Sequence, residues 1–403
     1  MIIELNRMAP TGEAIGHHDG LIVFVPFGMP GDSVEVEITV RRRSFARARI
    51  TRIIRPSSDR ITPPCRYFNR CGGCEWQHIP YEQQLTYKTQ AVKEQLIHVG
   101  KFGDIEVQPC KGSPNRTNYR NHTQLVLSAG GKLGYYRMSS HDIVEIEECL
   151  VVSAAINAMI ARFRTESIQP ITLPGSHTGS SFAAIREVHL RAGNHTGEEG
   201  AFYERDDGAI TRITPGAIHE RIGEGLYQVS PASFFQVNTG VAELLVDEVM
   251  SVLDLQGHET VLDLYCGAGL FTLPISRKAS DVVGVESNTS AAEDAEANLR
   301  GRPNARIINA SVEQALNSVE LQRPWDAVLV DPPRAGINRD SLHKLIGLGA
   351  HRIVYVSCDP ATLARDARII CEGGYTLARV QPLDMFPQTH HVETVVLLSR
   401  KMT

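Results

Sequence analysis

The sequence predicts an α/β protein of three parts: a small β-barrel, a mixed but mostly antiparallel central domain, and a doubly wound parallel sheet. Three observations predict this order. Short alternating runs surround a turn-rich segment near the N-terminus, and further short runs fill residues 105–235. After residue 236, apolar strands alternate with helix-like stretches. We place the three domains at 1–55, 56–235 and 236–403.

Composition limits the class of protein. The chain has 403 residues, a formal charge of −5 and 42% hydrophobic residues, which is enough to bury a sizeable core. This balance excludes a wholly basic nucleic-acid coat but permits a local basic patch. No apolar run is long enough to span a membrane, and the N-terminus lacks the basic and apolar segments of a secretory signal.

The predicted barrel has an uneven charge. Residues 1–40 contain six acids and one arginine, whereas residues 41–60 contain eight arginines and a single acid, Asp59. An arginine-rich strand pair can bind phosphate oxygens through bidentate guanidinium contacts. The alternative is a solvated basic edge strand that prevents aggregation. The sign bias favours contact with nucleic acid.

A linker and a helix follow the barrel. Pro56, Pro63 and Pro64 mark the linker, which ends at a cluster of cysteines. The segment after that cluster predicts a helix over residues 80–98, with Gly100 as its stop.

The C-terminal part contains five short apolar strands, each followed by a helix-like stretch, in segments 260–266, 281–287, 305–310, 325–333 and 352–358. Two further strand candidates, 375–384 and 392–400, have no helix between them. We expect them to close the sheet as an antiparallel pair. This pattern is typical of adenosylmethionine-dependent methyltransferases and differs from that of two-halved dinucleotide dehydrogenases.

The turn after the first of these strands predicts a cofactor site. Gly267 and Gly269 would let a ligand approach the backbone closely. The third glycine of the dinucleotide fingerprint is absent, because Thr272 stands in its place. Glu286 ends the second strand, where an acid accepts hydrogen bonds from ribose hydroxyls. This combination fits adenosylmethionine better than NAD, although Glu286 could be a solvated strand-end acid.

The fourth strand ends in Asp331-Pro332-Pro333-Arg334. Two prolines after an acid make a rigid exit that can form the wall of a pocket for a planar base. Methyltransferases that act on amino groups normally carry an aromatic residue where Arg334 stands. The arginine therefore favours chemistry at a ring carbon. A cytosine or amino-group methyltransferase is the alternative.

Methylation of carbon 5 of uracil needs covalent help, because this carbon is a poor nucleophile. A thiolate adds to carbon 6, and the resulting enolate attacks an electrophilic methyl group from carbon 5. A base must then remove the proton of carbon 5 so that elimination releases the enzyme. The sequence therefore needs one reactive cysteine and one base.

Cys358 and Glu393 are the candidates for these two groups. Cys358 ends the fifth strand and opens a predicted helix, whose N-terminus is expected to lower the pKa of the thiol. The alternative for Cys358 is a buried structural cysteine. Glu393 enters the last strand; by position alone it could be merely solvated, and His390 or His391 could serve equally well.

A second group of cysteines has the spacing of a metal site. Cys65, Cys71 and Cys74 lie within ten residues, and the distant Cys149 supplies a fourth thiol. Four thiolates can bind tetrahedral zinc or a cubane iron–sulfur cluster, and the spacing does not decide between them. Coincident free thiols are the third alternative.

Taken together, these motifs resemble the RNA uridine-5-methyltransferases, in particular the branch with an N-terminal OB-like TRAM domain and an iron–sulfur cluster. The resemblance covers essentially the whole chain. Its motifs are the basic barrel, the four cysteines, Phe234-Phe235-Gln236-Val237-Asn238, the turn beginning at Asp263, Asp331-Pro332-Pro333-Arg334, the segment 357–366 and the segment 385–393. Two departures are Leu270, where some relatives carry asparagine, and Asp359, which is often asparagine and which we expect to be tolerated.

The resemblance implies specific roles. Cys358 would be the nucleophile and Glu393 the proton acceptor, in a Rossmann-like class I methyltransferase domain. It implies that a [4Fe–4S] cluster is held in the central domain and that S-adenosyl-L-methionine is the methyl donor. The cluster ligands would be Cys65, Cys71, Cys74 and Cys149, and the adenosylmethionine-site positions Gln236, Tyr265, Glu286 and Asp331.

The expected partner is structured RNA. The resemblance implies 23S ribosomal RNA as substrate, and tRNA is the alternative. We expect no membrane association and infer no obligate protein partner. Iron–sulfur ligands and a thiolate nucleophile both suit a reducing cytoplasm. From a different class, a degenerate methyltransferase that serves as an RNA-binding module is the remaining hypothesis.

Overall fold

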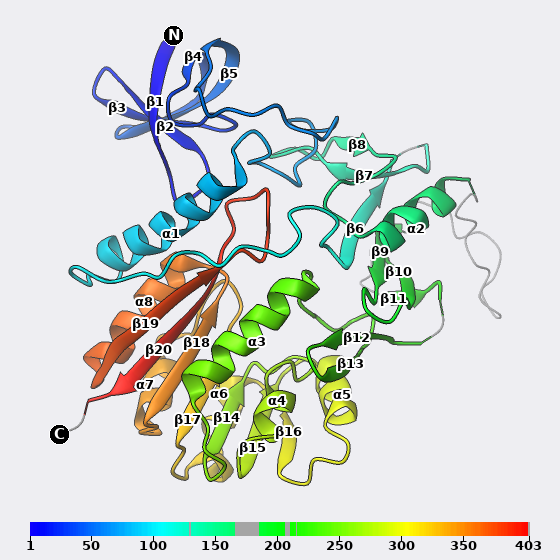
Figure 1. The fold of residues 1–403 in the computed structure, drawn as a ribbon, viewed down its shortest axis with the longest axis vertical. Helices are drawn as coiled ribbons and strands as arrows, with labels where there is room; N and C mark the ends of the chain where they lie inside the picture. The colour runs from blue at the N-terminus through cyan, green and yellow to red at the C-terminus, as the bar shows by residue number, and fades with distance from the viewer. Residues whose placement is uncertain (129, 166–184, 206–209, 215, 402–403) are drawn as a thin grey trace.

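The structure is a computed structural model that describes residues 1–128, 130–165, 185–205, 210–214 and 216–401. It consists of a barrel, a central sheet and a C-terminal sheet (Figure 1). The barrel and the C-terminal sheet lie at opposite ends of the long axis, and the central sheet lies beside them. None of the helices in these described ranges is long and apolar enough to cross a membrane.

The first five strands form a closed barrel in the order β1-β2-β3-β5-β4, which confirms the predicted small barrel. Alternate side chains point inward and form its core, joined by Trp76 and Ile79 from the segment that follows. Four arginines of the basic strand, Arg47, Arg49, Arg52 and Arg55, form ion pairs with acids elsewhere in the barrel. The strands are β1 (Ile2–Met8), β2 (Ala14–His18), β3 (Leu21–Val25), β4 (Ser33–Arg41) and β5 (Phe45–Arg55).

Helix α1 (Tyr81–His98) begins after Pro80 and ends just before Gly100, as the sequence predicted. It crosses between the barrel and the C-terminal sheet (Figure 1). Its Lys88 is fully buried and forms an ion pair with Asp384 of the C-terminal part. The helix thus joins the first and last parts of the chain.

The central sheet has six antiparallel strands in the order β11-β10-β9-β6-β7-β8, so the mostly antiparallel prediction is confirmed for the described residues. Helix α2 (Ala154–Thr165), which we did not predict, packs on one face of this sheet. A hairpin of β12 (Ile218–Ile222) and β13 (Gly225–Val229) leads to the last part. The six strands are β6 (His122–Leu127), β7 (Leu133–Tyr136), β8 (Ile143–Glu145), β9 (Ile185–Ala192), β10 (Glu199–Arg205) and β11 (Ile210–Arg212).

The C-terminal sheet has the order β16-β15-β14-β17-β18-β20-β19. Its first five strands are parallel, β20 is antiparallel to β18, and β19 is antiparallel to β20, which confirms the predicted doubly wound sheet closed by an antiparallel pair. Apolar cores cover both faces, which explains the continuous apolar runs of the strands. The strands are β14 (Thr260–Leu264), β15 (Asp281–Glu286), β16 (Ala305–Asn309), β17 (Ala327–Val330), β18 (Arg352–Ser357), β19 (Tyr375–Leu383) and β20 (Glu393–Arg400).

Helices connect these strands on both faces. A short 3₁₀ turn, Val319–Leu321, adds to the connection before β17. The helices are α3 (Thr239–Leu253), α4 (Thr272–Ser276), α5 (Thr289–Asn298), α6 (Val312–Ala315), α7 (Arg339–Gly347) and α8 (Pro360–Glu372).

Candidate active site and cysteine pocket

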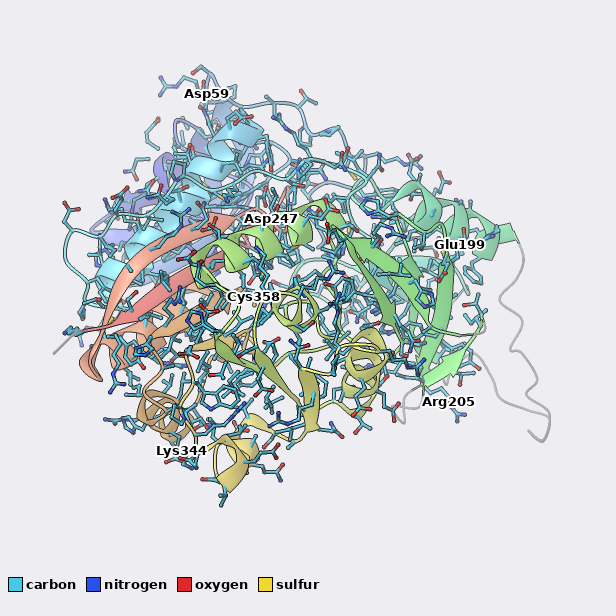
Figure 2. The ribbon with its side chains drawn as sticks, turned by 60° about the horizontal axis from the view of Figure 1, so that its bottom comes forward. Asp59, Glu199, Arg205, Asp247, Lys344 and Cys358 are labelled. Carbon is cyan, nitrogen blue, oxygen red and sulfur yellow. The ribbon has the colours of Figure 1, made fainter. Side chains whose placement is uncertain are left out.

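The carboxyl ends of the parallel strands gather the predicted site residues at one edge of the C-terminal sheet. Cys358 directly follows β18 and lies near the centre of the molecule in Figure 2. Strand β20 runs antiparallel to β18, with Ser357 opposite Thr394. Their neighbours Cys358 and Glu393 therefore meet at the same edge, although 35 positions separate them in the sequence.

The thiol of Cys358 is half-buried and its pKa is raised to about 11. Burial is the main cause, and the carboxyl group of Glu393 adds to it, whereas Arg334 lowers the pKa. The expected lowering of this pKa by a helix N-terminus is therefore not the net result, since burial outweighs it. The N-cap of α8 is Asp359, whose carboxylate accepts hydrogen bonds from the N–H groups of Ala361 and Thr362. An acid thus stands between the thiol and the helix terminus.

Glu393 is buried, with 3% of its surface exposed, and its Oε1 atom has no hydrogen-bond partner among the described residues. Burial raises the pKa of its carboxyl group well above the usual range, and Asp331 raises it further. Burial likewise raises the pKa of Asp331. A buried carboxyl group with a raised pKa and a free oxygen is suited to accept a proton once it is ionised.

The turn after β14 has the geometry of a ligand cradle. Gly267 has φ +56° and Gly269 has φ +84°, conformations that favour glycine. A Cβ atom on Gly267 would meet nothing within 4 Å, so space is open above this backbone. Glu286 at the end of β15 accepts a hydrogen bond from the N–H of Gly267 at 2.9 Å. Tyr265 begins the turn with φ +63°, in the same left-handed region.

Thr272, which replaces the third fingerprint glycine, has a structural role. Its hydroxyl group donates a hydrogen bond to Asp263 at 2.6 Å, and both residues are fully buried. Burial raises the pKa of Asp263 to about 7. Side chains therefore join strand β14 to helix α4. In a dinucleotide-binding fold, the third glycine instead lets the helix and the strand pack closely.

Gln236 lies in the segment just before α3. It is buried, and its carbonyl oxygen accepts a hydrogen bond from the amide of Asn121. Asn238, the N-cap of α3, donates to the carbonyl oxygen of Met385, just beyond β19. The neighbouring Phe234 is 67% exposed, which is unusual for a large aromatic side chain.

Arg334 is a site residue whose role the sequence did not reveal. Its side chain is exposed, and its Nη2 atom lies 3.3 Å from Nδ1 of His391. Its charge and hydrogen bonding lower the pKa of Cys358 and its charge lowers that of Glu393. Its position directly after Asp331-Pro332-Pro333 was the only available signal.

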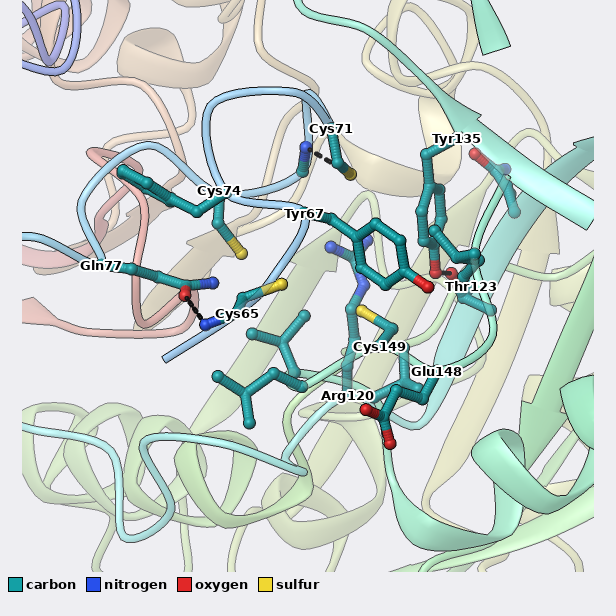
Figure 3. Close-up of a pocket in the computed structure, with 17 residues that line it drawn as sticks. Cys65, Tyr67, Cys71, Cys74, Gln77, Arg120, Thr123, Tyr135, Glu148 and Cys149 are labelled. Atoms are coloured by element: carbon teal, nitrogen blue, oxygen red, sulfur yellow. Dashed lines mark hydrogen bonds between the residues drawn. The ribbon is translucent and has the colours of Figure 1, made fainter. Parts of the chain in front are cut away.

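The four cysteines of the metal-type motif line one cavity of about 190 Å³ between the segment after the barrel and the central sheet. Figure 3 shows their sulfur atoms pointing into this cavity. None of them forms a disulfide. Burial and the neighbouring thiols raise the pKa of Cys71 to about 11 and that of Cys74 to about 12; burial also raises the pKa of Cys149. The fold thus brings together four cysteines that span 85 positions of the sequence.

A separate group of Glu187, His189 and Glu204 lies on β9 and β10, with potential ligand atoms within 4.8 Å of one another. Arg186 balances this acidic pair, at 3.2 Å from Glu204 and 3.8 Å from Glu187.

Comparisons with known proteins agree with this geometry. The family described as tRNA (Uracil-5-)-methyltransferase matches residues 221–401, and the TRAM domain family matches residues 2–51. An uncharacterised RNA methyltransferase of Caldanaerobacter subterraneus is 33% identical over 99% of this chain and 97% of its own length. One from Nostoc is 35% identical over 98% of this chain and 95% of its own.

A solved structure extends the similarity to the whole fold. The crystal structure of Pyrococcus abyssi tRNA (uracil-54, C5)-methyltransferase, in complex with S-adenosyl-L-homocysteine, is 28% identical in sequence. The alignment covers 99% of this chain and 100% of that one, with a TM-score of 0.78. Barrel, central sheet and C-terminal sheet therefore share one arrangement in the two proteins.

Proposed function

The chain belongs to the TRAM-containing RNA uracil-5-methyltransferase family, and we propose that Cys358 is its nucleophile and Glu393 its proton acceptor. The enzyme uses S-adenosyl-L-methionine to methylate carbon 5 of uracil in RNA. The observation that supports the two roles is the meeting of a half-buried thiol and a buried, partly unpartnered carboxyl group at the cofactor edge of the sheet.

The residues at this edge fit adenosylmethionine. The open backbone at Gly267 and the strand-end acid Glu286 form a cradle that leaves room for the ligand. We assign binding to Gln236, Tyr265, Glu286 and Asp331, which surround this edge. Bound adenosylmethionine supplies an electrophilic methyl group. The chain's own residues carry out the thiolate addition, the removal of the proton and the elimination.

Cys358 begins the reaction. Its thiolate adds to carbon 6 of the uracil, and the electron pair of the 5,6 double bond moves to give an enolate whose nucleophilic atom is carbon 5. Because the thiol has a raised pKa, the thiolate must be stabilised when RNA binds, and the guanidinium group of Arg334 is placed to do this. Addition breaks the double bond and forms one carbon–sulfur bond.

Glu393 completes the reaction. After carbon 5 carries the methyl group, the ionised carboxylate removes the proton from that carbon, the double bond re-forms and the carbon–sulfur bond breaks. The thiolate of Cys358 is regenerated, and Glu393 holds the proton. His391 is a poorer candidate, because burial lowers its pKa to about 3 and its Nδ1 atom contacts Arg334.

We further propose a [4Fe–4S] cluster on the four cysteines Cys65, Cys71, Cys74 and Cys149. The residues fit such a group, because four thiols without disulfides face one cavity. Bound iron would favour their thiolates and so reverse the raised pKa values. A reducing compartment such as the cytoplasm would preserve both this cluster and the nucleophile.

Four thiolates can bind either zinc or a cubane iron–sulfur cluster. The resemblance to the cluster-bearing branch favours the cluster. Measured iron and sulfide in protein purified without oxygen would support the cluster, and stoichiometric zinc would contradict it.

The substrate is structured RNA, and we propose 23S ribosomal RNA on the resemblance to the cluster-bearing branch. The barrel would contact the phosphate backbone through Arg41, Arg42 and Arg43, which have no ion-pair partner among the described residues. The exposed Phe234 beside Gln236 offers a face on which a base can stack. Transfer RNA is the second candidate, because the solved Pyrococcus enzyme acts on uracil 54 of tRNA.

The test is product identification. Protein prepared without oxygen is incubated with methyl-labelled adenosylmethionine and, separately, with 23S rRNA and tRNA transcripts, and the RNA is digested to nucleosides. Labelled 5-methyluridine from 23S rRNA alone would support the proposed substrate. The same product from tRNA alone would replace it with the second candidate. No methylated uridine from either RNA, in protein with its metal intact, would favour an RNA-binding module.

A further inference from the structure

A single loop carries the chain from β19 to Glu393. We call residues 384–392 the catalytic loop and residues 65–76 the cysteine loop, since the latter includes Cys65, Cys71 and Cys74. The two loops are more than 300 positions apart in the sequence but are joined by several hydrogen bonds. Through the catalytic loop, these bonds connect the cysteine loop to the surroundings of Cys358.

The backbone of the catalytic loop is fixed at Gln388. Its carbonyl oxygen accepts hydrogen bonds from the N–H groups of both Glu75 and Trp76, each at 3.0 Å. Its own N–H donates to the side chain of Gln84 at 3.0 Å. Gln388 has φ +72°, a conformation that residues other than glycine adopt only when their surroundings impose it. The cysteine loop therefore holds the catalytic loop in a shape that it would not adopt alone.

Side chains add a second connection. The carboxylate of Glu75, directly after Cys74, is hydrogen-bonded to Nδ1 of His390. The ring of His390 lies against that of His391, with centroids 4.1 Å apart. His391 in turn contacts Arg334 at 3.3 Å. This gives a continuous series of contacts from the residue after a cysteine of the pocket to the guanidinium group beside Cys358.

The barrel also contacts the point where the cysteine loop and the catalytic loop meet. Trp76 donates from its ring nitrogen to the carbonyl oxygen of Gly12 at 2.9 Å. Gly12 has φ +89°, and a Cβ atom there would lie 2.7 Å from the side chain of His390. Only glycine leaves room for the histidine at this point. Barrel, cysteine loop and catalytic loop thus meet at Gly12, Trp76 and His390.

The other half of the catalytic loop is anchored separately. Lys88 of α1 forms a buried ion pair with Asp384 and donates to the carbonyl oxygen of Phe386 at 3.1 Å. The hydroxyl group of Tyr119 donates to the carbonyl oxygen of Pro387 at 3.1 Å. The first half of the loop can therefore stay folded if the contact between Glu75 and His390 is lost.

We propose that Glu75 and His390 are positioning residues for methylation, which hold His391, and through it Arg334, against the nucleophile Cys358. This inference rests on the proposed roles of Cys358 and Glu393. It also gives the cysteine pocket a consequence for the reaction that needs no electron transfer. The cysteine loop that would hold the metal is the loop that orders the catalytic loop.

The experiment separates thiol addition from turnover. RNA with 5-fluorouridine at the target position can accept the thiolate and the methyl group but has no proton on carbon 5 to lose, so the covalent adduct accumulates. Its rate of formation is measured in single turnovers with metal-loaded Glu75→Ala, Glu75→Gln and His390→Ala. Metal content, RNA Kd and KM for RNA are measured for each protein.

We expect Glu75→Ala and His390→Ala to form the adduct at least about tenfold more slowly, because Arg334 is no longer held beside the thiol. RNA Kd and KM should stay within twofold of wild type, and Glu75→Gln, which can still bond to His390, should recover most of the rate. Glu147→Ala is the matched control. Glu147 stands two positions before Cys149 and pairs with Arg66 but does not contact the catalytic loop.

Adduct formation within twofold of wild type in both Glu75→Ala and His390→Ala would overturn the inference. If Glu75→Ala loses its metal, His390→Ala decides the question, because His390 bonds to Glu75 and packs on His391 and is not a ligand candidate itself. Cys358→Ala, run beside them, tests the premise. An adduct with Cys358→Ala would contradict the proposed nucleophile, whereas its absence together with a normal Glu75→Ala rate would contradict only the positioning role.

Discussion

Half-buried thiols of two kinds can be compared in this chain, those of the four-cysteine pocket beside the central sheet and that of Cys358 on the edge of the C-terminal sheet. In both settings burial raises the thiol pKa to similar values, about 11 for Cys71 and for Cys358. The neighbours differ. The pocket thiols face other thiols, while Cys358 faces the carboxyl group of Glu393 and the guanidinium group of Arg334.

This comparison shows that a thiol pKa alone does not identify a function. Several thiols around one cavity can share a soft metal, which removes their protons on binding. A single thiol between a cation and a proton acceptor has the partners of a covalent catalyst. The set of neighbours, and not the shift in pKa, separates the two sites.

The variant Cys358→Ala should show the largest difference between the two thiol sites. We expect turnover to fall by at least about 10⁴-fold, because no other group at this edge can add to carbon 6. Metal content and RNA binding should be unchanged, since the pocket is elsewhere. Methyl transfer and metal are measured on the same preparation. A variant that lost its metal as well would show that the two sites are not independent.

Glu393→Gln should slow turnover by about 10²–10⁴-fold, the range typical for loss of a general base. The amide cannot remove the proton from carbon 5, so elimination stalls and a covalent protein–RNA species accumulates with unmodified RNA. Denaturing gel electrophoresis with labelled RNA measures this species. Normal product release by this variant would assign the proton to another base.

The pH dependence tests the electrostatics of Cys358. Its pKa is raised, so the neutral thiol predominates at neutral pH, and the thiolate fraction grows about tenfold per pH unit. Glu393, whose pKa is also raised, must lose its proton too, so both groups act in the same direction. We expect kcat/KM to rise from pH 7 to about pH 9. A flat or falling profile, in protein that stays folded, would contradict this.

Cys74→Ser should affect the pocket more than the chemistry. We expect loss of bound metal, a decrease of about 2–4 kcal/mol in the free energy of unfolding and a decrease in turnover of about tenfold, because the cysteine loop no longer orders the catalytic loop. Cys371→Ser, in α8 and outside both sites, is the matched control. Metal analysis and chemical denaturation measure the effect. A stable Cys74→Ser protein with its metal intact would remove Cys74 from the ligand set.

Substitution of exposed arginines of the barrel should have the smallest effect on activity. Arg42→Ala with Arg43→Ala should raise KM for RNA by about three- to tenfold and reduce the salt dependence of binding, with both thiol sites unchanged. Arg49→Ala should do less, because Arg49 is already paired with Glu37 at 2.6 Å. Filter binding at several salt concentrations measures this. If Arg49→Ala weakened RNA binding as much as the double variant, the ion pairs of the barrel would have to open on binding.

Much of the fold could be predicted because its signals are local. Each strand of the C-terminal sheet is a short apolar run between turn residues, and strand periodicity depends only on neighbouring positions. The edge at which Cys358 lies follows from strand order, since parallel strands end together. The helix α2 was not predicted, because the surrounding short runs gave residues 105–235 the appearance of strands throughout.

Other features required the tertiary structure, because they depend on residues far apart in the sequence. The pKa of Cys358 is set by burial and by Glu393, which only the antiparallel return of β20 brings beside it. The ion pairs that occupy Arg47 and Arg49 depend on barrel closure. The contact between Glu75 and His390 joins positions 315 residues apart. The sequence by itself determined which chemical groups this protein has and on which elements they lie. Packing decided which of them face one another, because desolvation and charge act through space and not along the chain.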